Sequence, residues 1–241
     1  MRIKFKNPPG IIPSLDVELR EAKRLVDGIT DLKREVAALK IGSLLCWKHG
    51  LLKVVSEIKE LCDFPVIFDA QKGGTDIPEI VKMQIEIAAE AGVDAFIAGP
   101  QGSGSVTLET FVKSCNEHGI TPIIVLEMTH PGANDFLTEN ASERILEISL
   151  DLGVENFVAP ANKPERLRLF KNTAREKKKH LTIFSPGVGP QGGGPDSAVF
   201  AGADFIIAGR SIYQAENPKE KIISMFTSIK NAYEERKRLE K

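Results

Sequence analysis

The stretch Ala203-Asp204-Phe205-Ile206-Ile207-Ala208-Gly209-Arg210-Ser211-Ile212-Tyr213 contains the unit from which the whole chain is built. It holds an apolar run, Phe205–Ala208, of the kind found in a strand that is buried on both faces. Gly209 and Arg210 follow, and the chain then enters a segment of helical spacing. This order of buried strand, short turn and helix is the βα unit of a parallel α/β fold.

The same unit recurs along the 241 residues. The expected strands, each followed by a helical segment, are Ile11–Asp16, Val36–Ile41, Val66–Ala70, Ala95–Ala98, Pro122–Glu127, Asn156–Ala159, Leu181–Ser185 and Phe205–Ala208. A chain of this length with eight such units favours a closed barrel, for which about 250 residues is usual. The turn Leu15-Asp16-Val17-Glu18 has no glycine, which argues against a dinucleotide-binding Rossmann fold. We therefore predict a single (β/α)8 TIM barrel domain over residues 1–241.

Composition excludes several classes of partner. The 32 Lys and Arg residues nearly cancel the 33 Asp and Glu residues, so the net charge is −1 and no footprint for nucleic acid or a membrane surface is left. The basic runs Arg175–Lys179 and Arg236–Lys241 are expected on solvated helix surfaces. No segment approaches the roughly 20 apolar residues that span a bilayer. We expect a cytoplasmic protein that binds neither nucleic acid nor membranes.

The three cysteines and one of the helices give further expectations. Cys46, Cys62 and Cys115 match no zinc-binding spacing, so we expect buried thiols in a reducing compartment. The helix after the third strand has amphipathic spacing, typical of a helix that buries its apolar face. Its expected apolar face carries Ile80, Met83, Ile87 and Ala91, and its charged face carries Lys82, Glu86 and Glu90.

Glycine is concentrated in the loop Pro186–Gly194, which contains five glycines. So many glycines carry an entropic cost, and they allow several backbone N–H groups to approach an anion. The eighth strand ends in Gly209 and Arg210 and enters a helix, which adds backbone donors and a guanidinium beside this loop. The loops after strands seven and eight are the frequent phosphate site of the barrel fold. The sequence therefore predicts a phosphorylated small-molecule ligand, the alternative being a mobile turn beside an ordinary surface arginine.

Charged residues end the first three strands. Asp16, Lys40 and Asp69 lie at the strand ends, and Lys72 and Asp76 come just beyond. In a barrel these positions gather on the face that carries the active site. Alternating carboxylates and ammoniums keep lysines charged and destabilise a nearby substrate anion. Each residue alone is more often part of a structural ion pair, and the pattern lacks the histidine and carboxylate cluster of a metal site.

Six motifs resemble those of the orotidine 5′-phosphate decarboxylase family in its compact form, and the matches run from the first strand to the last helix. The motifs are Ser14-Leu15-Asp16-Val17, Leu39-Lys40-Ile41-Gly42, Phe68-Asp69 through Lys72 to Asp76-Ile77-Pro78, Glu127-Met128-Thr129-His130-Pro131-Gly132-Ala133, Pro186-Gly187-Val188-Gly189-Pro190-Gln191-Gly192-Gly193, and Ala203 to Tyr213. The carboxyl-terminal half carries the more specific part of this resemblance.

The resemblance implies conversion of orotidine 5′-phosphate to uridine 5′-phosphate in pyrimidine biosynthesis, with no metal or organic cofactor. It implies that Lys72 protonates C6 as carbon dioxide leaves and that Asp69 lies against the departing carboxylate. Lys40 would hold the charged network and the ribose. Asp76 would enter the site of the partner subunit in a homodimer.

The same resemblance implies the residues that bind the nucleotide. Asp16 would bind the ribose hydroxyls, and Thr129 would bind the pyrimidine edge. The phosphate would contact Gln191 and Arg210, surrounded by Pro186, Gly187, Gly189, Gly192 and Gly209. Phosphate binding energy, remote from the reacting carbon, can close the glycine-rich loop and stabilise the transition state.

The third-strand signature departs from the family in its spacing. The family reads Asp-x-Lys-x-x-Asp, and this chain has one extra residue in each gap: Asp69-Ala70-Gln71-Lys72-Gly73-Gly74-Thr75-Asp76. Side chains at i and i+2 of a strand share a face, whereas those at i and i+3 do not. Lys72 can therefore meet Asp69 only where the chain bulges or has left the strand. Without a bulge, Gln71 occupies the lysine's place.

Three functions stay open at this point. The first is decarboxylation by a homodimer. The second is a related, magnesium-dependent enzyme acting on a sugar phosphate, against which Lys40 argues because an ammonium there would repel the metal. The third is a non-catalytic phosphate-ligand-binding paralogue. The altered spacing motivates it, as do Ile80 and Ala98-Gly99-Pro100, which stand where the family has other residues.

Overall fold

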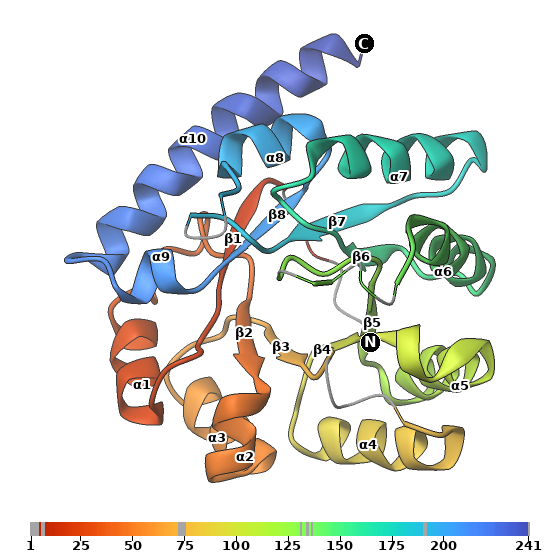
Figure 1. The fold of residues 1–241 in the computed structure, drawn as a ribbon. Coiled ribbons are helices and arrows are strands. Elements are labelled where there is room, and N and C mark those ends of the chain that lie inside the picture. Colours follow the sequence, from red (N-terminus) through yellow and green to blue (C-terminus); the bar gives the residue numbers. More distant parts are fainter. Residues whose placement is uncertain are drawn as a thin grey trace.

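The computed structural model describes residues 5, 8–71, 76–130, 132–133, 135, 137–189 and 192–240. Eight parallel strands stand at the centre with helices around them (Figure 1). The strands are β1 (Gly10–Pro13), β2 (Leu39–Gly42), β3 (Val66–Asp69), β4 (Ala95–Ala98), β5 (Thr121–Val125), β6 (Asn156–Val158), β7 (Thr182–Ser185) and β8 (Phe205–Ala208). Their order is β1-β8-β7-β6-β5-β4-β3-β2. All eight predicted strands are present, and the predicted barrel fold is confirmed.

The helices follow the strands around the outside of the barrel. They are α1 (Leu19–Asp27), α2 (Ser43–His49), α3 (Leu51–Lys59), α4 (Pro78–Glu90), α5 (Gly104–His118), α6 (Glu139–Asp151), α7 (Pro164–Glu176), α8 (Pro195–Ala201), α9 (Arg210–Tyr213) and α10 (Pro218–Leu239), with a 3-10 turn η1 (Pro100–Gly102) before α5. The helices α4, α7, α8 and α10 each begin with a proline, at the position where a missing N–H costs no helical hydrogen bond.

The barrel closes between β1 and β2 through irregular pairing. Isolated bridges join Ile11 to Val36 and Ser14 to Lys40. Across this seam the backbone N–H of Leu15 donates to the carbonyl of Lys40 at 2.9 Å. The two strands are shorter than predicted, so Asp16 lies in the loop beyond β1 rather than on the strand.

Apolar side chains form one core inside the barrel and another between strands and helices. The inner core includes Ile12, Ile97 and Phe184, and the outer one includes Ile11, Phe96 and Ile183. Neighbouring residues of one strand therefore point into different cores, which explains why the strands are uninterrupted apolar runs. Phe5 packs edge-on against Phe184 inside the barrel, with ring centroids 4.8 Å apart.

Helix α4 does not bury the apolar face that its spacing singles out. The side chains it turns toward the barrel are those of Val81, Ile85 and Ala88. The exposed set is Ile80, Met83 and Ile87, at 38%, 56% and 46% exposure. The helix is thus apolar on two sides, and the predicted buried face is an apolar stripe on the surface.

Helix α10 is fixed to the barrel by Arg236, which is buried although the sequence places it in a solvated basic run. Its Nη1 donates to the carbonyl oxygens of Val199 at 2.8 Å and Ala203 at 2.9 Å, and its Nη2 donates to Asp204 at 3.0 Å. Asp204 also pairs with Lys171 at 2.6 Å, where burial lowers the pKa of the lysine against the pull of the carboxylate. Figure 1 shows α10 running along α8, the helix that carries Val199.

The cysteines and the apolar segments were the subject of two further expectations. Cys115 is buried, whereas Cys46 and Cys62 are only half-buried, so the prediction of three buried thiols is wrong for two of them. Within the described ranges, no helix has both the length and the apolar character that crossing a membrane requires.

Candidate active site

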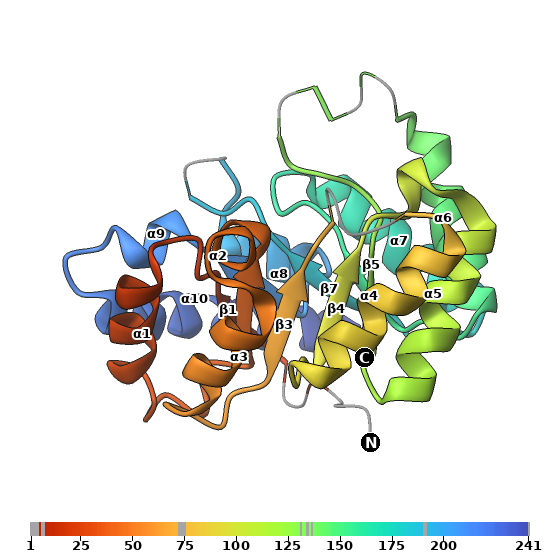
Figure 2. The same ribbon diagram turned by 90° about the horizontal axis from the view of Figure 1, so that it is seen from below.

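A cavity of about 400 Å³ opens at the carboxyl-terminal ends of the strands. Small-molecule sites in proteins span roughly 300–1,000 Å³. Apolar side chains of Ile97, Val158 and Ile207 line the cavity, together with polar and charged residues from five strand ends. The loops after β5 and β7 rise from the same end of the barrel (Figure 2). This end is the functional face of barrel enzymes.

Three of the predicted charged residues meet on one wall of this cavity. The Nζ atom of Lys40 lies 2.8 Å from Oδ2 of Asp69 and 3.7 Å from Oδ2 of Asp16. The hydroxyl of Ser14 donates to Asp16. Burial alone would lower the pKa of Lys40, but attraction by Asp69 and Asp16 outweighs it and the pKa lies above its ordinary value. The ammonium therefore stays charged although Lys40 is buried.

Gly42 makes room for this charged cluster. A Cβ atom there would lie 2.5 Å from Oδ1 of Asp16 and 3.7 Å from Nζ of Lys40. The backbone angles, φ −90° and ψ 172°, suit any residue, so the glycine is required for space. The motif that contains Lys40 thus needs its glycine two residues later.

Gln71 contacts Asp69 on its other side. Its Nε2 atom lies 2.9 Å from Oδ1 and 3.1 Å from Oδ2 of the carboxylate. Gln71 comes just beyond the end of β3 and lines the cavity. Among the residues that the structure describes, Gln71, two positions after Asp69, lies beside the carboxylate. Lys72, and with it residues 73–75, lies outside the described residues.

Within one chain, Asp76 does not lie in the cluster of Asp16, Lys40 and Asp69. It is exposed, and its Oδ1 accepts the backbone N–H of Ile77 at 2.7 Å. The described cavity wall does not include it.

Residues predicted to bind the phosphate line the same cavity. Pro186 and Gly187 line it from the loop after β7, and Gly209 and Arg210 line it from the end of β8. The two strands are direct neighbours in the barrel. The structure thus brings a guanidinium and the backbone of two glycine-containing turns to one side of the cavity.

The outer part of the glycine-rich loop folds on itself. The N–H of Gly189 donates to Gly193 at 3.1 Å, and the N–H of Gly193 donates to Gly187 at 3.1 Å. Gly189 and Gly192 do not line the cavity, and a Cβ on Gly189 would lie 3.3 Å from Cβ of Ser211. The loop therefore rests on the start of α9. Gln191, the predicted phosphate partner, lies outside the described residues.

Thr129 and His130 line the cavity from the loop after β5, as does Met128. Glu127, at the same strand end, is not available as a reactive group. It is buried, and it accepts hydrogen bonds from Arg166 on α7 and from the hydroxyl of Ser142 on α6, the latter at 3.0 Å. Glu127 therefore ties this loop to two helices.

Sequence reasoning did not single out Ser14 or Tyr213, both of which line the cavity. Burial and the negative charge of Asp16 raise the pKa of Tyr213, while Arg210 and Lys40 pull it down. Its ring lies beside Gly209, where an added Cβ atom would be 3.4 Å from Cε1 of Tyr213. Helical spacing could have predicted that Tyr213 lines the cavity, because residues three apart share a helix face and Tyr213 is three residues after Arg210.

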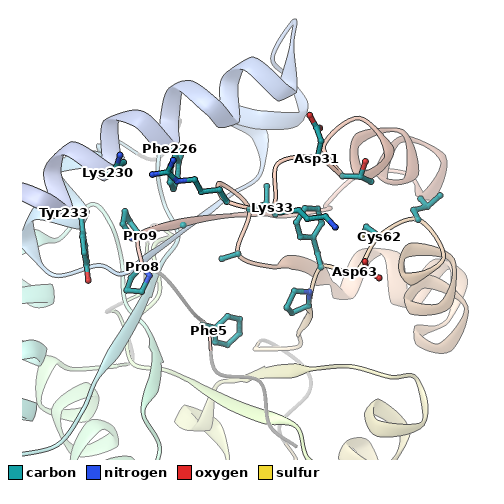
Figure 3. Close-up of a pocket in the computed structure, with 18 of the residues that line it drawn as sticks. Phe5, Pro8, Pro9, Asp31, Lys33, Cys62, Asp63, Phe226, Lys230 and Tyr233 are labelled. Carbon is teal, nitrogen blue, oxygen red and sulfur yellow. The ribbon is translucent and has the colours of Figure 1, made fainter.

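A larger cavity, about 1620 Å³, lies at the opposite, amino-terminal end of the barrel (Figure 3). Phe226, Lys230 and Tyr233 of α10 form one side of it, and Asp31 lies on the other. Asp31 pairs with Lys219, which is not part of the lining, at 2.7 Å, and Lys230 pairs with Glu234, four residues on in the same helix, at 3.7 Å. The smaller cavity is the one with converging charges at the functional face.

No cluster of three or more His, Cys, Asp or Glu side chains suited to a metal ion occurs among the described residues. The centre of the charged cluster is the ammonium of Lys40. A cation bound between Asp16 and Asp69 would have to displace it.

Comparison with known proteins agrees with the motifs. The sequence profile described as "Orotidine 5'-phosphate decarboxylase / HUMPS family" matches residues 9–224. Orotidine 5′-phosphate decarboxylase of Methanosarcina mazei is 38% identical over 213 residues, covering 87% of this chain and 90% of the relative. The enzyme of that name from Thermococcus kodakarensis is 34% identical over 221 residues, covering 91% and 96%. These curated relatives are carboxy-lyases by name.

Solved structures agree as well. Orotidine 5′-monophosphate decarboxylase of Methanocaldococcus jannaschii, complexed with the inhibitor BMP, superposes with a TM-score of 0.82 at 30% identity, covering 92% of this chain and 99% of the other. The enzyme of Pyrococcus horikoshii OT3 gives 0.77 at 29% identity, covering 91% and 99%. The chain therefore belongs to the orotidine 5′-phosphate decarboxylase / HUMPS family, as its motifs predict, and its curated relatives in that family are carboxy-lyases.

Proposed function

We propose that the chain decarboxylates orotidine 5′-phosphate to uridine 5′-phosphate in pyrimidine biosynthesis. The observation that carries the proposal is one cavity lined by both sets of residues. Asp16, Lys40 and Asp69 form the charged cluster, to which we assign the reacting part of the substrate, and Arg210 with the backbone of Gly187 forms the part of the wall to which we assign the phosphate. The named activity of the curated relatives supports this substrate.

The proposed roles of the charged cluster follow from the balance between its positive and negative charges. Asp16, Lys40 and Asp69 together carry two negative charges and one positive charge. Lys72 is proposed to add the missing positive charge. The substrate carboxylate would lie against Asp69, and the repulsion between these like charges is relieved when carbon dioxide leaves. The C6–carboxylate bond breaks, its electron pair stays on C6, and the ammonium of Lys72 supplies the proton; the resulting amine regains a proton from water.

At the other end, binding of the phosphate is proposed to position the nucleotide. Arg210 would pair with the phosphate oxygens, with Gln191 and backbone N–H groups of the loop beside them. Asp16 would accept hydrogen bonds from the ribose hydroxyls, and Thr129 would bind the pyrimidine edge. Interactions so far from C6 contribute to the rate when they hold the substrate in its reactive position.

The direct test is turnover of orotidine 5′-phosphate, followed by the loss of its ultraviolet absorbance. We expect activity that persists after EDTA treatment, because the proposed chemistry uses no metal. Replacing Arg210 with alanine should raise KM by about 10- to 100-fold, as expected for loss of hydrogen bonds to a charged group. Absence of turnover by folded protein that still binds a uridine phosphate analogue would overturn the proposal, and activity on a ketose phosphate that requires magnesium would favour the sugar-phosphate alternative.

We further infer that the enzyme is a homodimer joined through α4. The exposed stripe of Ile80, Met83 and Ile87 lies on a helix whose opposite side is already packed on the barrel. Exposed apolar surface of this kind is a common mark of association. Asp76 precedes the first turn of the same helix and is exposed. In a two-fold dimer through α4, each Asp76 would therefore lie close to the partner, whose cavity we propose it enters.

Replacing Met83 with glutamate is expected to convert the dimer into monomers, because it buries a charge in an apolar interface. The monomers should lose at least about 10-fold in kcat/KM, since Asp76 would no longer reach a partner site. Sedimentation velocity and turnover would be measured on the same samples. Lys82→Ala, on the adjacent charged face of α4, is the matched control and should stay dimeric. A fully active Met83→Glu monomer would contradict the shared-site proposal.

A further inference from the structure

We infer that Gln71 is a positioning residue that orients the Asp69 carboxylate for the reaction, and that Gly99 provides the space in which Gln71 does so. The inference rests on the proposed decarboxylation. It concerns the segment in which the chain departs from the spacing of its family.

The first support is that both oxygens of Asp69 are engaged. Oδ2 accepts from Nζ of Lys40 at 2.8 Å and from Nε2 of Gln71 at 3.1 Å, and Oδ1 accepts from the same Nε2 at 2.9 Å. The carboxylate cannot rotate without losing one of these bonds. Asp69 is 9% exposed, so bulk water does not readily replace a lost donor.

The second support is that Gln71 donates without adding charge. A second cation bonded to both oxygens would neutralise Asp69 and remove its repulsion toward a substrate carboxylate. The amide of Gln71 instead fixes the direction of the carboxylate and leaves its charge in place. Orientation by Gln71 and charge balance by Lys40 are therefore separate contributions.

The third support is the close approach of Gly99, just after β4, to the backbone carbonyl of Gln71. A Cβ at position 99 would lie 2.6 Å from the carbonyl oxygen of Gln71 and 2.8 Å from Oε1 of Gln101. Gln101 cannot move aside freely, because its Nε2 donates to the carbonyl of Val125 at 2.8 Å. The angles of Gly99, φ −110° and ψ 99°, suit any residue, so the glycine is required for space.

These contacts connect two departures from the family pattern. One is the spacing after Asp69, which puts Gln71 beside the carboxylate. The other is Ala98-Gly99-Pro100 at the end of β4, which the sequence alone leaves without a reason. The structure gives the reason, since Gly99 leaves room for the backbone carbonyl of Gln71.

The first test compares Gln71→Met, which keeps the length of the side chain and removes the donor, with the wild-type enzyme. We expect kcat for orotidine 5′-phosphate to fall by about 10- to 100-fold, the cost of one hydrogen bond to a buried charge, with KM changed less than about threefold. Gln214→Met, at an exposed glutamine outside the site, is the matched control. Unchanged kcat in Gln71→Met would overturn the inference.

The second test is the pH profile of Gln71→Glu. A third carboxylate in the cluster adds a negative charge and should favour uptake of a proton there, so the acid limb of the kcat profile should move to higher pH by about one unit or more. Among the described residues, the titratable groups beside Asp69 are Lys40 and Asp16, and Glu127, His130, Arg210 and Tyr213 line the same cavity. A residue that only stabilised the turn would change the melting temperature and leave the profile in place, and that result would contradict the inference.

The third test asks whether Gly99 acts through Gln71. Gly99→Ala should lower kcat by a similar factor, and the double variant with Gln71→Met should be no slower than the worse single variant. Gly102→Ala is the matched control, because a Cβ there meets nothing within 4 Å. Additive losses would overturn the link. Wild-type turnover is measured first: its absence counts against the proposed function, whereas turnover unaffected by these variants counts against this inference alone.

Discussion

Replacing Lys72 with alanine should lower kcat for orotidine 5′-phosphate by about 10²- to 10⁴-fold, the usual contribution of a positioned proton donor. The described cluster has two carboxylates and one ammonium, so the variant loses both the proton donor and the second positive charge proposed for the cluster. Affinity for uridine 5′-phosphate should change by less than about 10-fold, because the phosphate end is untouched. The loss of substrate absorbance measures kcat, and isothermal titration calorimetry with uridine 5′-phosphate measures the affinity.

The matched control for this prediction is Lys113→Ala, at an exposed lysine of α5. It should leave both kcat and product affinity unchanged. If Lys72→Ala retained wild-type turnover, Lys72 would not be the proton donor. If the wild-type protein bound the nucleotide without turnover and the variant behaved alike, the chain would be the non-catalytic paralogue.

The largest effect on stability is expected from Arg236→Ala. The variant leaves the carbonyls of Val199 and Ala203 without their donor and removes one partner of Asp204. Breaking a buried ion pair from one side costs about 3–5 kcal/mol. For a protein of this size that corresponds to a fall in Tm of roughly 6–20 °C, measurable by thermal unfolding followed by circular dichroism.

Arg238→Ala is the matched control, since Arg238 is exposed on the same helix. Its effect should stay within about 0.5 kcal/mol. Equal melting temperatures for the two variants would contradict the prediction and would mean that apolar contacts alone hold α10 on the barrel.

The strands and the gathering of charges were predictable from sequence for a physical reason. Strands buried on both faces are uninterrupted apolar runs, so β4 and β8 match their predicted bounds. The ends of parallel strands share one face of a barrel, which is enough to bring Asp16, Lys40 and Asp69 together. These features depend on local pattern and on one topological rule.

Other features depend on contacts between distant residues and could not be predicted in this way. One partner of Glu127 is Arg166, 39 residues away in the chain. Arg236 looks like any residue of a basic run until Asp204 is packed beside it. Helix α4 is apolar on two sides, and its sequence does not say which side meets the barrel. Only the packing of α4 on the strands decides that question.

The seam between β1 and β2 couples ligand binding to the integrity of the barrel. Asp16 follows β1 and Lys40 belongs to β2. A nucleotide that contacts both residues would therefore link the two strands across the seam. By thermodynamic linkage, a ligand at 100 times its Kd favours the state that binds it by about 2.7 kcal/mol. Local opening of the seam, and proteolysis that depends on such opening, should therefore be slowest when substrate is abundant.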